Sequence, residues 1–398
     1  MVGAGDRHTV NTRIPGVANM SARDDSVRRS MLVVLIAVAL LAAAFVAVLV
    51  FDGKAPGRKP AADPSTSHTA HPRRVLPVGL NTGSSLLGLD RADLDAAVSE
   101  IAATGITWIR VDFSWTEIQP TSADAWVWGP TDRVVDAARK HGIHVLGLVT
   151  YTPAWARVRG CSSFTCPPAQ AAAFGRFVGE VGERYVPRGV RTFQVWNEPN
   201  LDMFWKSPNP AAYGDVVRRA AAALRDGHRG RVQVIFGSLA VPDHAADGID
   251  PAVFVRAACV ARCKVDAVGF DPYTFPALPS ATSRPATAWY GLTPEGGLRQ
   301  AINRAIGPTT PIWVTQFGAP VAEGSVRAPF VDERQQTAII LAGLRLARQQ
   351  PTVGGYFVNT WRDVAGASDY RGRFGLWESD GTPRPVVGAL RRALHAGR

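Results

Sequence analysis

The 398-residue sequence predicts an α/β fold: a (β/α)8 TIM barrel preceded by a single N-terminal transmembrane helix and a disordered tether. Two observations predict the barrel. From residue 75 onward, eight short apolar runs alternate with amphipathic stretches, as in a parallel sheet with crossover helices. No GxGxxG or GxxxxGKS/T segment follows these runs, which weakens the alternative of an open nucleotide-binding sheet. A third observation, the uncharged run at residues 31–51, predicts the membrane helix.

The chain before the barrel divides by composition into three segments. Residues 1–30 are predicted to be a cytoplasmic tail, residues 31–51 an uncleaved anchor, and residues 52–74 a linker rich in Pro, Ala, Ser, Thr and His. As a helix the anchor would span about 30 Å, the thickness of a bilayer's hydrocarbon core. The alternative is a cleaved signal peptide, whose apolar region is usually only about 7 to 15 residues long.

The flanks of this apolar segment carry similar positive charge, so charge alone does not set its orientation. Three arginines precede it and three basic residues follow it: Arg23, Arg28, Arg29, Lys54, Arg58 and Lys59. A first helix followed by a tether and one large domain most simply has its N-terminus in the cytoplasm. We therefore expect a single-pass protein of the cell membrane with its barrel domain, residues 75–398, outside the cytoplasm.

The elements of the barrel domain follow from hydrophobic patterning. Eight runs have the length and apolar character of buried strands: residues 76–81, 108–113, 145–150, 192–196, 232–237, 267–270, 312–315 and 355–359. Amphipathic stretches between them predict helices at residues 90–104, 131–141, 168–184, 210–225 and 332–349. Eight alternations over about 320 residues fit a closed barrel better than an open doubly wound sheet.

The positive charge of the chain does not indicate a nucleic-acid partner. The net charge is +11, but residues 1–74 carry ten Lys and Arg against five Asp and Glu, so the barrel domain is only mildly basic. No basic run interleaved with aromatic residues occurs, and no nucleic-acid motif is present. The partners we expect are an oligo- or polysaccharide and, through the N-terminal helix, a membrane; we expect the protein to be a monomer.

The four cysteines form two pairs close in sequence, Cys161 with Cys166 and Cys259 with Cys263. Outside the cytoplasm such pairs predict two disulfides, each fixing a loop or helix end near the barrel mouth. A four-cysteine metal site is a weaker alternative, because the spacings match no common zinc ribbon. Free buried thiols are the remaining alternative.

The residues that end the predicted strands indicate a saccharide site. In a (β/α)8 barrel, function is located at the C-terminal ends of the strands. These ends collect aromatic, amide, arginine and acidic side chains: Asn81, Arg110, Asp112, Trp115, Tyr151, Trp155, Trp196, Asn197, Glu198, Ser238, Asp271, Tyr273, Gln316, Asn359 and Trp361. Aromatic rings stack on the C–H faces of sugars, whereas amides, arginine and carboxylates bond the hydroxyls.

The strongest motif is FQVWNEPN, residues 193–200, in which Asn-Glu-Pro follows the fourth strand. Pro199 ends that strand and places Glu198 at the barrel rim. A carboxyl group in an aromatic, partly dry pocket has a raised pKa and protonates a glycosidic oxygen well. On the fourth strand of eight, this tripeptide predicts that Glu198 is a general acid.

With this motif the sequence resembles the clan A glycoside hydrolases, the barrel superfamily of cellulases, xylanases and β-xylosidases, over residues 76–392. The segments IRVDFSW with Arg110, YTPAW with Tyr151 and Trp155, Trp361, and FGLWESDGTPRP at residues 374–385 also fit that family. The resemblance implies hydrolysis of a glycosidic bond with retention, by an acid/base on strand four and a carboxylate nucleophile on strand seven. It implies no metal and no organic cofactor.

Two positions depart from the family's pattern. In PIWVTQFGAP, residues 311–320, Gln316 stands where the resemblance implies the nucleophilic glutamate. In GFDPY, residues 269–273, Asp271 stands where the family has histidine, and Tyr273 keeps its place. An amide neither ionises nor attacks carbon readily at neutral pH. The site therefore keeps a carboxylate, but at another position.

Three functional readings follow. In the first, the protein hydrolyses O-glycosidic bonds of an extracellular or envelope polysaccharide, with Glu198 as acid and with Asp271, Glu117 or Glu323 as base or nucleophile. A displaced acid favours inversion, and a variant of this reading has Gln316 orient an N-acetyl group that attacks. In the second, a catalytically silent barrel binds a cell-envelope glycan, since Gln316 lacks the charge for covalent chemistry. In the third, the protein is a transglycosylase or a scaffold in a wall-building complex.

Overall fold

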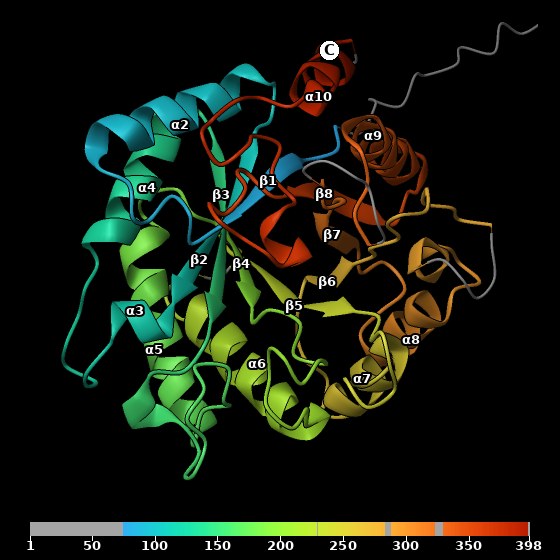
Figure 1. Ribbon diagram of the computed structural model, residues 1–398. Helices are drawn as coiled ribbons and strands as arrows, with labels where there is room; N and C mark the ends of the chain where they lie inside the picture. The colour runs from blue at the N-terminus through green and yellow to red at the C-terminus, as the bar shows by residue number, and fades with distance from the viewer. Residues whose placement is uncertain (1–74, 229, 283–287, 323–328, 397–398) are drawn as a thin grey trace, which may run out of the picture. The chain divides into compact units, whose positions relative to one another are not determined.

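The computed structural model describes residues 75–228, 230–282, 288–322 and 329–396, and Figure 1 shows a ring of helices around a central barrel. The predicted tail, anchor and linker at residues 1–30, 31–51 and 52–74 lie outside the described residues. Within the described residues, none of the helices combines the length and the apolar character needed to cross a membrane. The anchor therefore stays a prediction from the sequence.

Eight parallel strands close into a barrel in chain order, which confirms the predicted fold. The strands are β1 Val78–Gly83, β2 Trp108–Ser114, β3 His144–Thr150, β4 Thr192–Val195, β5 Gln233–Ala240, β6 Ala267–Asp271, β7 Ile312–Phe317 and β8 Val353–Asn359. Each overlaps a predicted strand. Their side chains are buried on both faces, which is why the sequence shows short continuous apolar runs instead of strict alternation.

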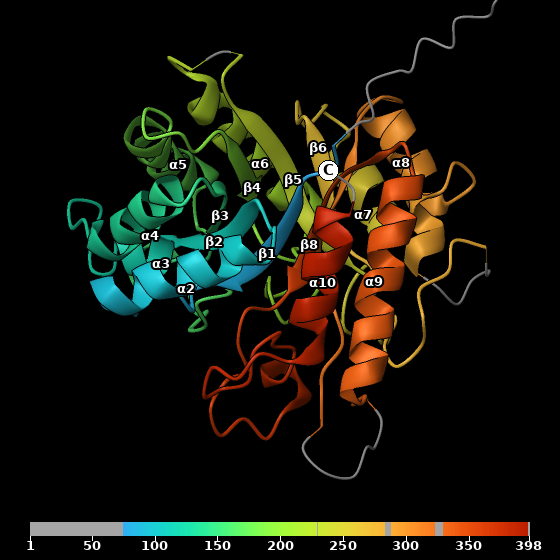
Figure 2. The ribbon, with the colours of Figure 1, turned by 90° about the horizontal axis from the view of Figure 1, so that it is seen from above.

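The helices surround the barrel, and Figure 2 shows α9 and α10 side by side. Their bounds are α2 Arg91–Ala103, α3 Trp115–Ile118, α4 Gly129–Lys140, α5 Ala171–Tyr185, α6 Pro210–Arg225, α7 Pro251–Ala258, α8 Gly297–Ala305, α9 Glu333–Gln349 and α10 Pro385–His395. All five predicted helices are present. Several begin at an Asp or Asn cap, such as Asn209 before Pro210 and Asp332 before Glu333.

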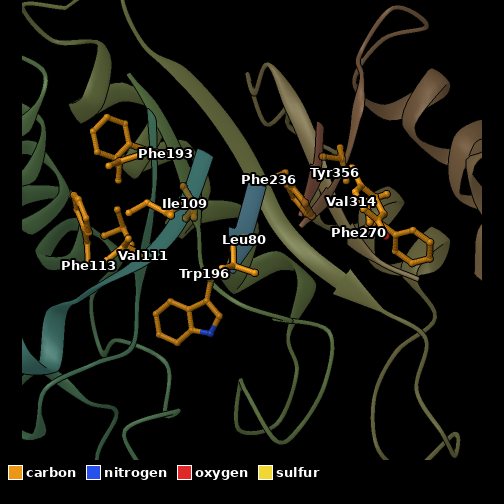
Figure 3. Close-up of a cluster of buried hydrophobic side chains, with 14 of the residues drawn as sticks. Leu80, Ile109, Val111, Phe113, Phe193, Trp196, Phe236, Phe270, Val314 and Tyr356 are labelled. Atoms are coloured by element: carbon orange, nitrogen blue, oxygen red, sulfur yellow. The ribbon is translucent and has the colours of Figure 1, made fainter. Parts of the chain in front are cut away.

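The core has an outer and an inner part. Outward-facing strand side chains such as Val111, Phe113 and Phe193 pack against the helices in the cluster that Figure 3 shows. Inside the barrel a separate group of six apolar residues fills the end from which the strands start: Trp108, Leu146, Ile235, Ala267, Trp313 and Phe357. We call this group the apolar plug. It makes the barrel a packed core and confines any site to the opposite end.

Glycine makes room for the large rings of the apolar plug. A Cβ atom added at Gly79 would overlap the Phe357 ring, and one added at Gly355 would press on the Trp313 ring. The two rings stack on each other with centroids 5.9 Å apart. These glycines therefore fix the size of the side chains that neighbouring strands can carry at this level.

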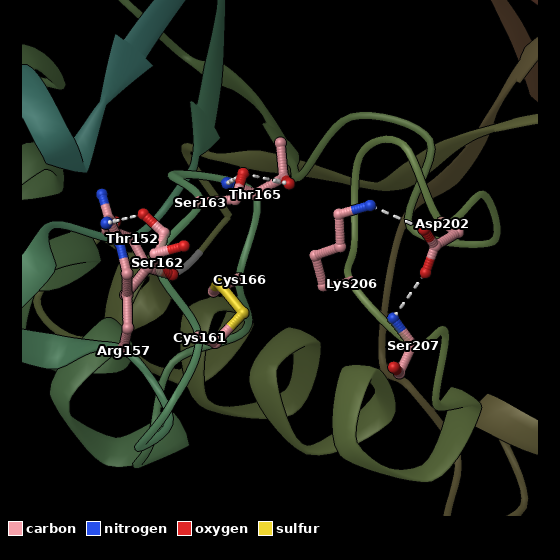
Figure 4. Close-up of a disulfide and its surroundings, with 10 residues drawn as sticks. All are labelled: Thr152, Arg157, Cys161, Ser162, Ser163, Thr165, Cys166, Asp202, Lys206 and Ser207. Carbon is pink, nitrogen blue, oxygen red and sulfur yellow. Dashed lines mark hydrogen bonds and ion pairs between the residues drawn. A yellow bond between two sulfur atoms is a disulfide. The ribbon is translucent and has the colours of Figure 1, made fainter.

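The structure pairs the cysteines as Cys161–Cys166 and Cys259–Cys263. The first disulfide lies in the loop between β3 and α5, at the mouth, where Figure 4 shows Arg157 donating to the carbonyl of Thr152. The expectation that both lie near the mouth is wrong for the second. Cys259 follows the end of α7, which leads into the start of β6, so this disulfide lies at the opposite end of the barrel.

Candidate active site

Irregularities in three strand pairs shape the mouth of the barrel. The register shifts between Asn81 and Gly83 in β1, between Phe236 and Ser238 in β5, and between Val314 and Phe317 in β7. Such a bulge changes which face a side chain points to. Because of the shift in β7, consecutive residues Thr315 and Gln316 both contact Asp271.

Glu198 occupies a strained segment directly after β4. Trp196 and Glu198 have φ angles of 71° and 42°, and Tyr151, which follows β3, has a φ of 65°. Non-glycine residues adopt this left-handed region rarely, and the strain concentrates at functional sites. Three of the strained residues therefore mark the rim where the sequence predicts the general acid.

Gln316 is the centre of the polar network. Its Nε2 donates to Asp271 Oδ2 at 2.7 Å, to Asn197 Oδ1 at 3.0 Å and, more weakly, to Glu198 Oε1 at 3.3 Å. Its Oε1 accepts a hydrogen bond of 3.1 Å from Asn81 Nδ2. The amide therefore has a defined orientation, with its nitrogen toward the acids and its oxygen toward β1.

Arg110 supports this network from below and is 2% exposed. Its guanidinium donates to three amide oxygens, at 2.7 Å to Asn81 and to Asn197 and at 2.9 Å to Gln194. No carboxylate of the described residues forms a salt bridge with it. Burial raises the pKa of both Glu198 and Asp271, and the positive charge of Arg110 acts through space to oppose that rise.

Asp271 lies beneath Gln316 and is 1% exposed. Its Oδ1 accepts from Thr315 Oγ1 at 2.6 Å, and its Oδ2 accepts from Gln316 Nε2 at 2.7 Å. Both of its oxygens are therefore hydrogen-bonded, and almost none of its surface is exposed. The carboxylate of Asp271 is thus enclosed in the hydrogen-bond network next to Gln316.

Glu198 and Asp271 form a carboxyl pair bridged by the Gln316 amide, whose Nε2 donates to both. Burial raises the pKa of Glu198 well above its ordinary value, and the charge of Asp271 raises it further. Burial also raises the pKa of Asp271, but hydrogen bonds from Thr315 and Gln316 and the charge of Arg110 oppose that rise. Burial and the charge of Asp271 therefore favour the protonated form of Glu198, whereas the charge of Arg110 favours the ionised form of both carboxyl groups.

The spacing of this pair argues against inversion, which the sequence favoured for a displaced acid. Gln316 Nε2 bridges Glu198 Oε1 and Asp271 Oδ2 at 3.3 and 2.7 Å. These oxygens are therefore closer together than the separation of about 6.5 to 9.5 Å that leaves room for an attacking water.

The predicted aromatic residues divide into exposed and buried ones. Trp155 is 39% exposed and its Nε1 donates to the carbonyl of Gln119, while Tyr151 and Tyr273 are half-buried. Trp115 is fully buried against Phe174 and Phe177, so it offers no face to a sugar. Trp361 is 3% exposed and is covered by the Arg362 guanidinium. The predicted substrate-binding role of Trp115 conflicts with this packing.

The other acids named from the sequence are Asp112, Glu117 and Glu323. Burial raises the pKa of Asp112 to about 6, and Arg110 opposes this rise while Glu117 adds to it. Glu117 itself lies on α3 with an exposed side chain. Glu323 lies outside the described residues. Asp112 is thus the third acid that the structure places beside Arg110.

Sequence reasoning missed several members of the site. Gln194 and Thr315 are mid-strand residues that hold Arg110 and Asp271, and nothing in their local pattern separates them from core. Phe164, 51% exposed, lies in the Cys161–Cys166 loop and packs edge-on against Tyr151 with ring centroids 4.9 Å apart. Its position inside a predicted disulfide loop at the mouth was the available signal.

Comparisons with known proteins identify the fold. No protein-family model and no curated protein matches the chain. A family 39 glycoside hydrolase from the gut symbiont Bacteroides cellulosilyticus WH2 is 19% identical with a TM-score of 0.61, covering 80% of this chain and 63% of its own length. The chain thus spans less than two thirds of that protein.

Two other solved structures are similar. A monomeric beta-xylosidase from Caulobacter crescentus CB15 is 18% identical with a TM-score of 0.59, covering 80% of this chain and 67% of its own. GH5_18 from Streptomyces cattleya, in complex with Manb1-4GlcNAc, is 18% identical with a TM-score of 0.61 and covers 81% of each chain. At these identities the likeness shows a shared eight-stranded parallel barrel, and the barrels that share it include glycoside hydrolases.

Proposed function

We propose that the barrel is a glycosidase-like hydrolase of O-glycosidic bonds in an extracellular or envelope polysaccharide, with Glu198 as general acid and base. The observation that carries the proposal is the Glu198–Asp271 pair at the mouth. Burial and Asp271 raise the pKa of Glu198 well above its ordinary value. A carboxyl that keeps its proton at neutral pH can protonate the leaving oxygen of a glycoside.

Asp271 takes over one task of the missing nucleophile. In a retaining glycosidase the second carboxylate both attacks carbon and lies near the acid. Asp271 keeps a negative charge beside Glu198, which sustains the raised pKa of the acid. Its burial and its two hydrogen bonds argue against the other task, attack on the sugar.

The attacking atom is then best supplied by the substrate. Gln316 Oε1 accepts one hydrogen bond, from Asn81, and retains a second acceptor position for the N–H of a 2-acetamido group. The acetamido oxygen attacks C1 while Glu198 protonates the leaving oxygen, which gives a cyclic oxazolinium ion. Glu198 then takes a proton from water, and the water opens the ring at C1. The substrate class proposed is therefore a 2-acetamido glycoside.

The test is a panel of chromogenic glycosides matched in pairs, with and without the 2-acetamido group. Wild type is expected to cleave the acetamido member of a pair, and Glu198→Gln is expected to lose about 10² to 10⁴ of that rate. The control must lie outside the network of Arg110, which includes Asn197. Glu180→Gln is the matched control, since Glu180 is an exposed residue of α5 outside the site. Equal rates for wild type and Glu198→Gln would remove Glu198 from the mechanism.

The second candidate is a glycan-binding barrel without turnover. It is favoured by the side chain at the strand-seven position, since Gln316 is an amide fixed by four hydrogen bonds. A glycan microarray run beside the glycoside panel separates the two. Binding of a glycan with no cleavage of any substrate would support this candidate and contradict the first.

We also infer that residues 31–51 hold the protein in the cell membrane with the barrel outside the cytoplasm. The support is the length and apolar character of that run and the single large domain that follows it. Protease added to intact cells or spheroplasts is expected to digest the barrel, and the mature chain to keep its N-terminus. A shortened, soluble product would contradict this inference.

A further inference from the structure

A groove with a basic lining lies at the end of the barrel opposite the mouth. It has a volume of about 530 Å³ and is formed by the ends of α7 and α8, which lie side by side in Figure 1. Three arginines line it, Arg256, Arg262 and Arg304, and no Asp or Glu does. This size and lining suit a small anionic group.

The three arginines of this groove have no protein partner among the described residues. All are exposed, and none forms a salt bridge, a hydrogen bond or a ring contact with a described side chain, unlike the nearby Arg225, which pairs with Asp266 at 2.6 Å. Guanidinium groups are well suited to bind phosphate through paired N–H donors. The lining of the groove therefore includes three arginines whose donors are not used by described protein groups.

A fourth arginine is buried directly behind the groove. Arg299 is 2% exposed, and it donates to Asn303 Oδ1 at 2.8 Å and to the carbonyls of Thr310 and Gly307 at 2.6 and 3.4 Å. Burial lowers its pKa, and no carboxylate of the described chain offsets its charge. Asn303 and Gly307 are themselves groove residues. An uncompensated buried cation thus adds its field to the three exposed ones.

The groove lies at the end of the barrel where the chain enters from the N-terminal segments. The ends of α7 and α8 lead into the starts of β6 and β7, and Val75, the first described residue, lies just before the start of β1. All strands are parallel, so the groove and the point where residues 1–74 join the barrel are at the same end. The linker of residues 52–74 connects that end to the apolar run at residues 31–51.

The rim of the groove is also apolar at its most exposed point. The Cys259–Cys263 disulfide closes a short turn that displays Val260, which is 83% exposed, between Arg256 and Arg262. An exposed aliphatic side chain flanked by arginines matches the boundary between lipid headgroups and acyl chains. Contact of the Val260 side chain with a membrane surface would remove its apolar surface from water, which is favourable.

We infer that this groove binds the phosphate of an anionic phospholipid headgroup and holds the lower end of the barrel against the membrane surface. The mouth then faces away from the membrane, toward glycans of the envelope. This inference rests on the membrane attachment proposed above for residues 31–51, on the groove and on the chain's point of entry, and it does not depend on the chemistry proposed for Glu198.

The test uses the full chain in micelles of an uncharged detergent to which phosphatidylglycerol or phosphatidylcholine is added. Hydrogen exchange is followed in peptides that contain residues 256–264 and 303–308. With phosphatidylglycerol at about ten times its dissociation constant, local opening should be suppressed by roughly tenfold. Phosphatidylcholine, which is neutral overall, should give much less protection.

Two triple variants with the same number of Arg→Glu changes, one in the groove and one elsewhere, separate the site from the net charge. Arg256→Glu, Arg262→Glu and Arg304→Glu together should remove the protection by phosphatidylglycerol. The same three-charge change at exposed arginines elsewhere, Arg159→Glu, Arg176→Glu and Arg334→Glu, should preserve it. Equal loss in both triple variants would mean that net charge alone causes binding, and would overturn the site.

Inorganic phosphate distinguishes a lipid from a free anion. Phosphate alone should protect the same peptides only weakly, because it lacks the glycerol and acyl parts that meet Val260. Full protection by phosphate with no response to phosphatidylglycerol would overturn the membrane assignment. No response to either probe would overturn the groove as an anion site.

Discussion

The two layers inside this barrel come from the same strands but differ in the interactions that stabilise them. The apolar plug fills the lower layer with rings and aliphatic chains, whereas the upper layer, around Arg110, Gln316 and Asp271, consists of buried polar groups. On β7 the change occurs within two residues, from Trp313 to Thr315. The plug is stabilised by burial alone, but each upper group needs a specific partner.

The contrast between the two layers indicates which residues contribute mainly to stability and which hold the polar site. A plug residue contributes in proportion to the apolar surface it buries and can be exchanged for one of similar size. A residue of the upper layer is costly when its partner is lost, since a buried polar atom then remains unpaired. The following predictions test that division, from the largest expected effect to the smallest.

Trp313→Ala should lower the free energy of unfolding by about 3 to 5 kcal/mol, because it removes a large ring from the middle of the plug. Urea unfolding measures this loss. Trp313→Phe, which keeps an aromatic ring, is the milder companion and should cost clearly less. Glycan affinity per folded molecule should be the same in all three proteins, and a large drop in affinity would break the separation of the layers.

Gln316→Glu should destabilise the fold by roughly 3 kcal/mol at neutral pH, because a further carboxyl group then shares the single charge of Arg110. Adding Asp271→His should recover most of that loss. The double variant also restores a carboxylate beside Glu198, so it should show retaining glycosidase activity. The checks are urea unfolding and the anomeric configuration of the first product by NMR; a double variant no more stable than the single one would contradict the argument.

Thr315→Val should cost about 1.5 to 3 kcal/mol, since it removes the 2.6 Å hydrogen bond to the charged Asp271 while nearly keeping the volume. Thr150→Val is a matched control, as the buried Thr150 hydroxyl has no hydrogen-bond partner among the described residues. Calorimetry on both variants compares them. Equal losses would show that the Thr315 hydroxyl does not support Asp271.

Glu198→Gln should change how stability depends on pH. A carboxyl whose folded-state pKa exceeds its unfolded value of about 4.3 stays protonated in the native state after the unfolded chain has lost the proton. Its contribution to stability therefore falls as pH rises from that value toward the raised pKa, by up to about 1.4 kcal/mol per pH unit. Unfolding free energies of wild type and variant from pH 4 to 8 should diverge in favour of the variant, whereas parallel curves would contradict a raised pKa.

The sequence was sufficient for the barrel and for the place of Glu198, because short apolar runs and an Asn-Glu-Pro after the fourth strand depend on local pattern. It was insufficient for α3, α7, α8 and α10, and for the packing of Trp115, whose spacing does not distinguish core from rim. The bulge in β7 that directs Gln316 inward leaves no local signal. The end of the barrel at which Cys259–Cys263 lies follows only from the position of α7.

The central claim is that Glu198 holds the proton of its pair with Asp271 at neutral pH. Infrared difference spectroscopy of wild type against Glu198→Gln across a pH titration measures this directly through the carbonyl band of a protonated carboxylic acid. We predict that the band assigned to Glu198 is present at neutral pH, and that in Asp271→Asn it titrates at lower pH because the neighbouring charge is gone. A neutral-pH difference spectrum that lacks this band, and shows an ionised carboxylate in its place, would contradict the account.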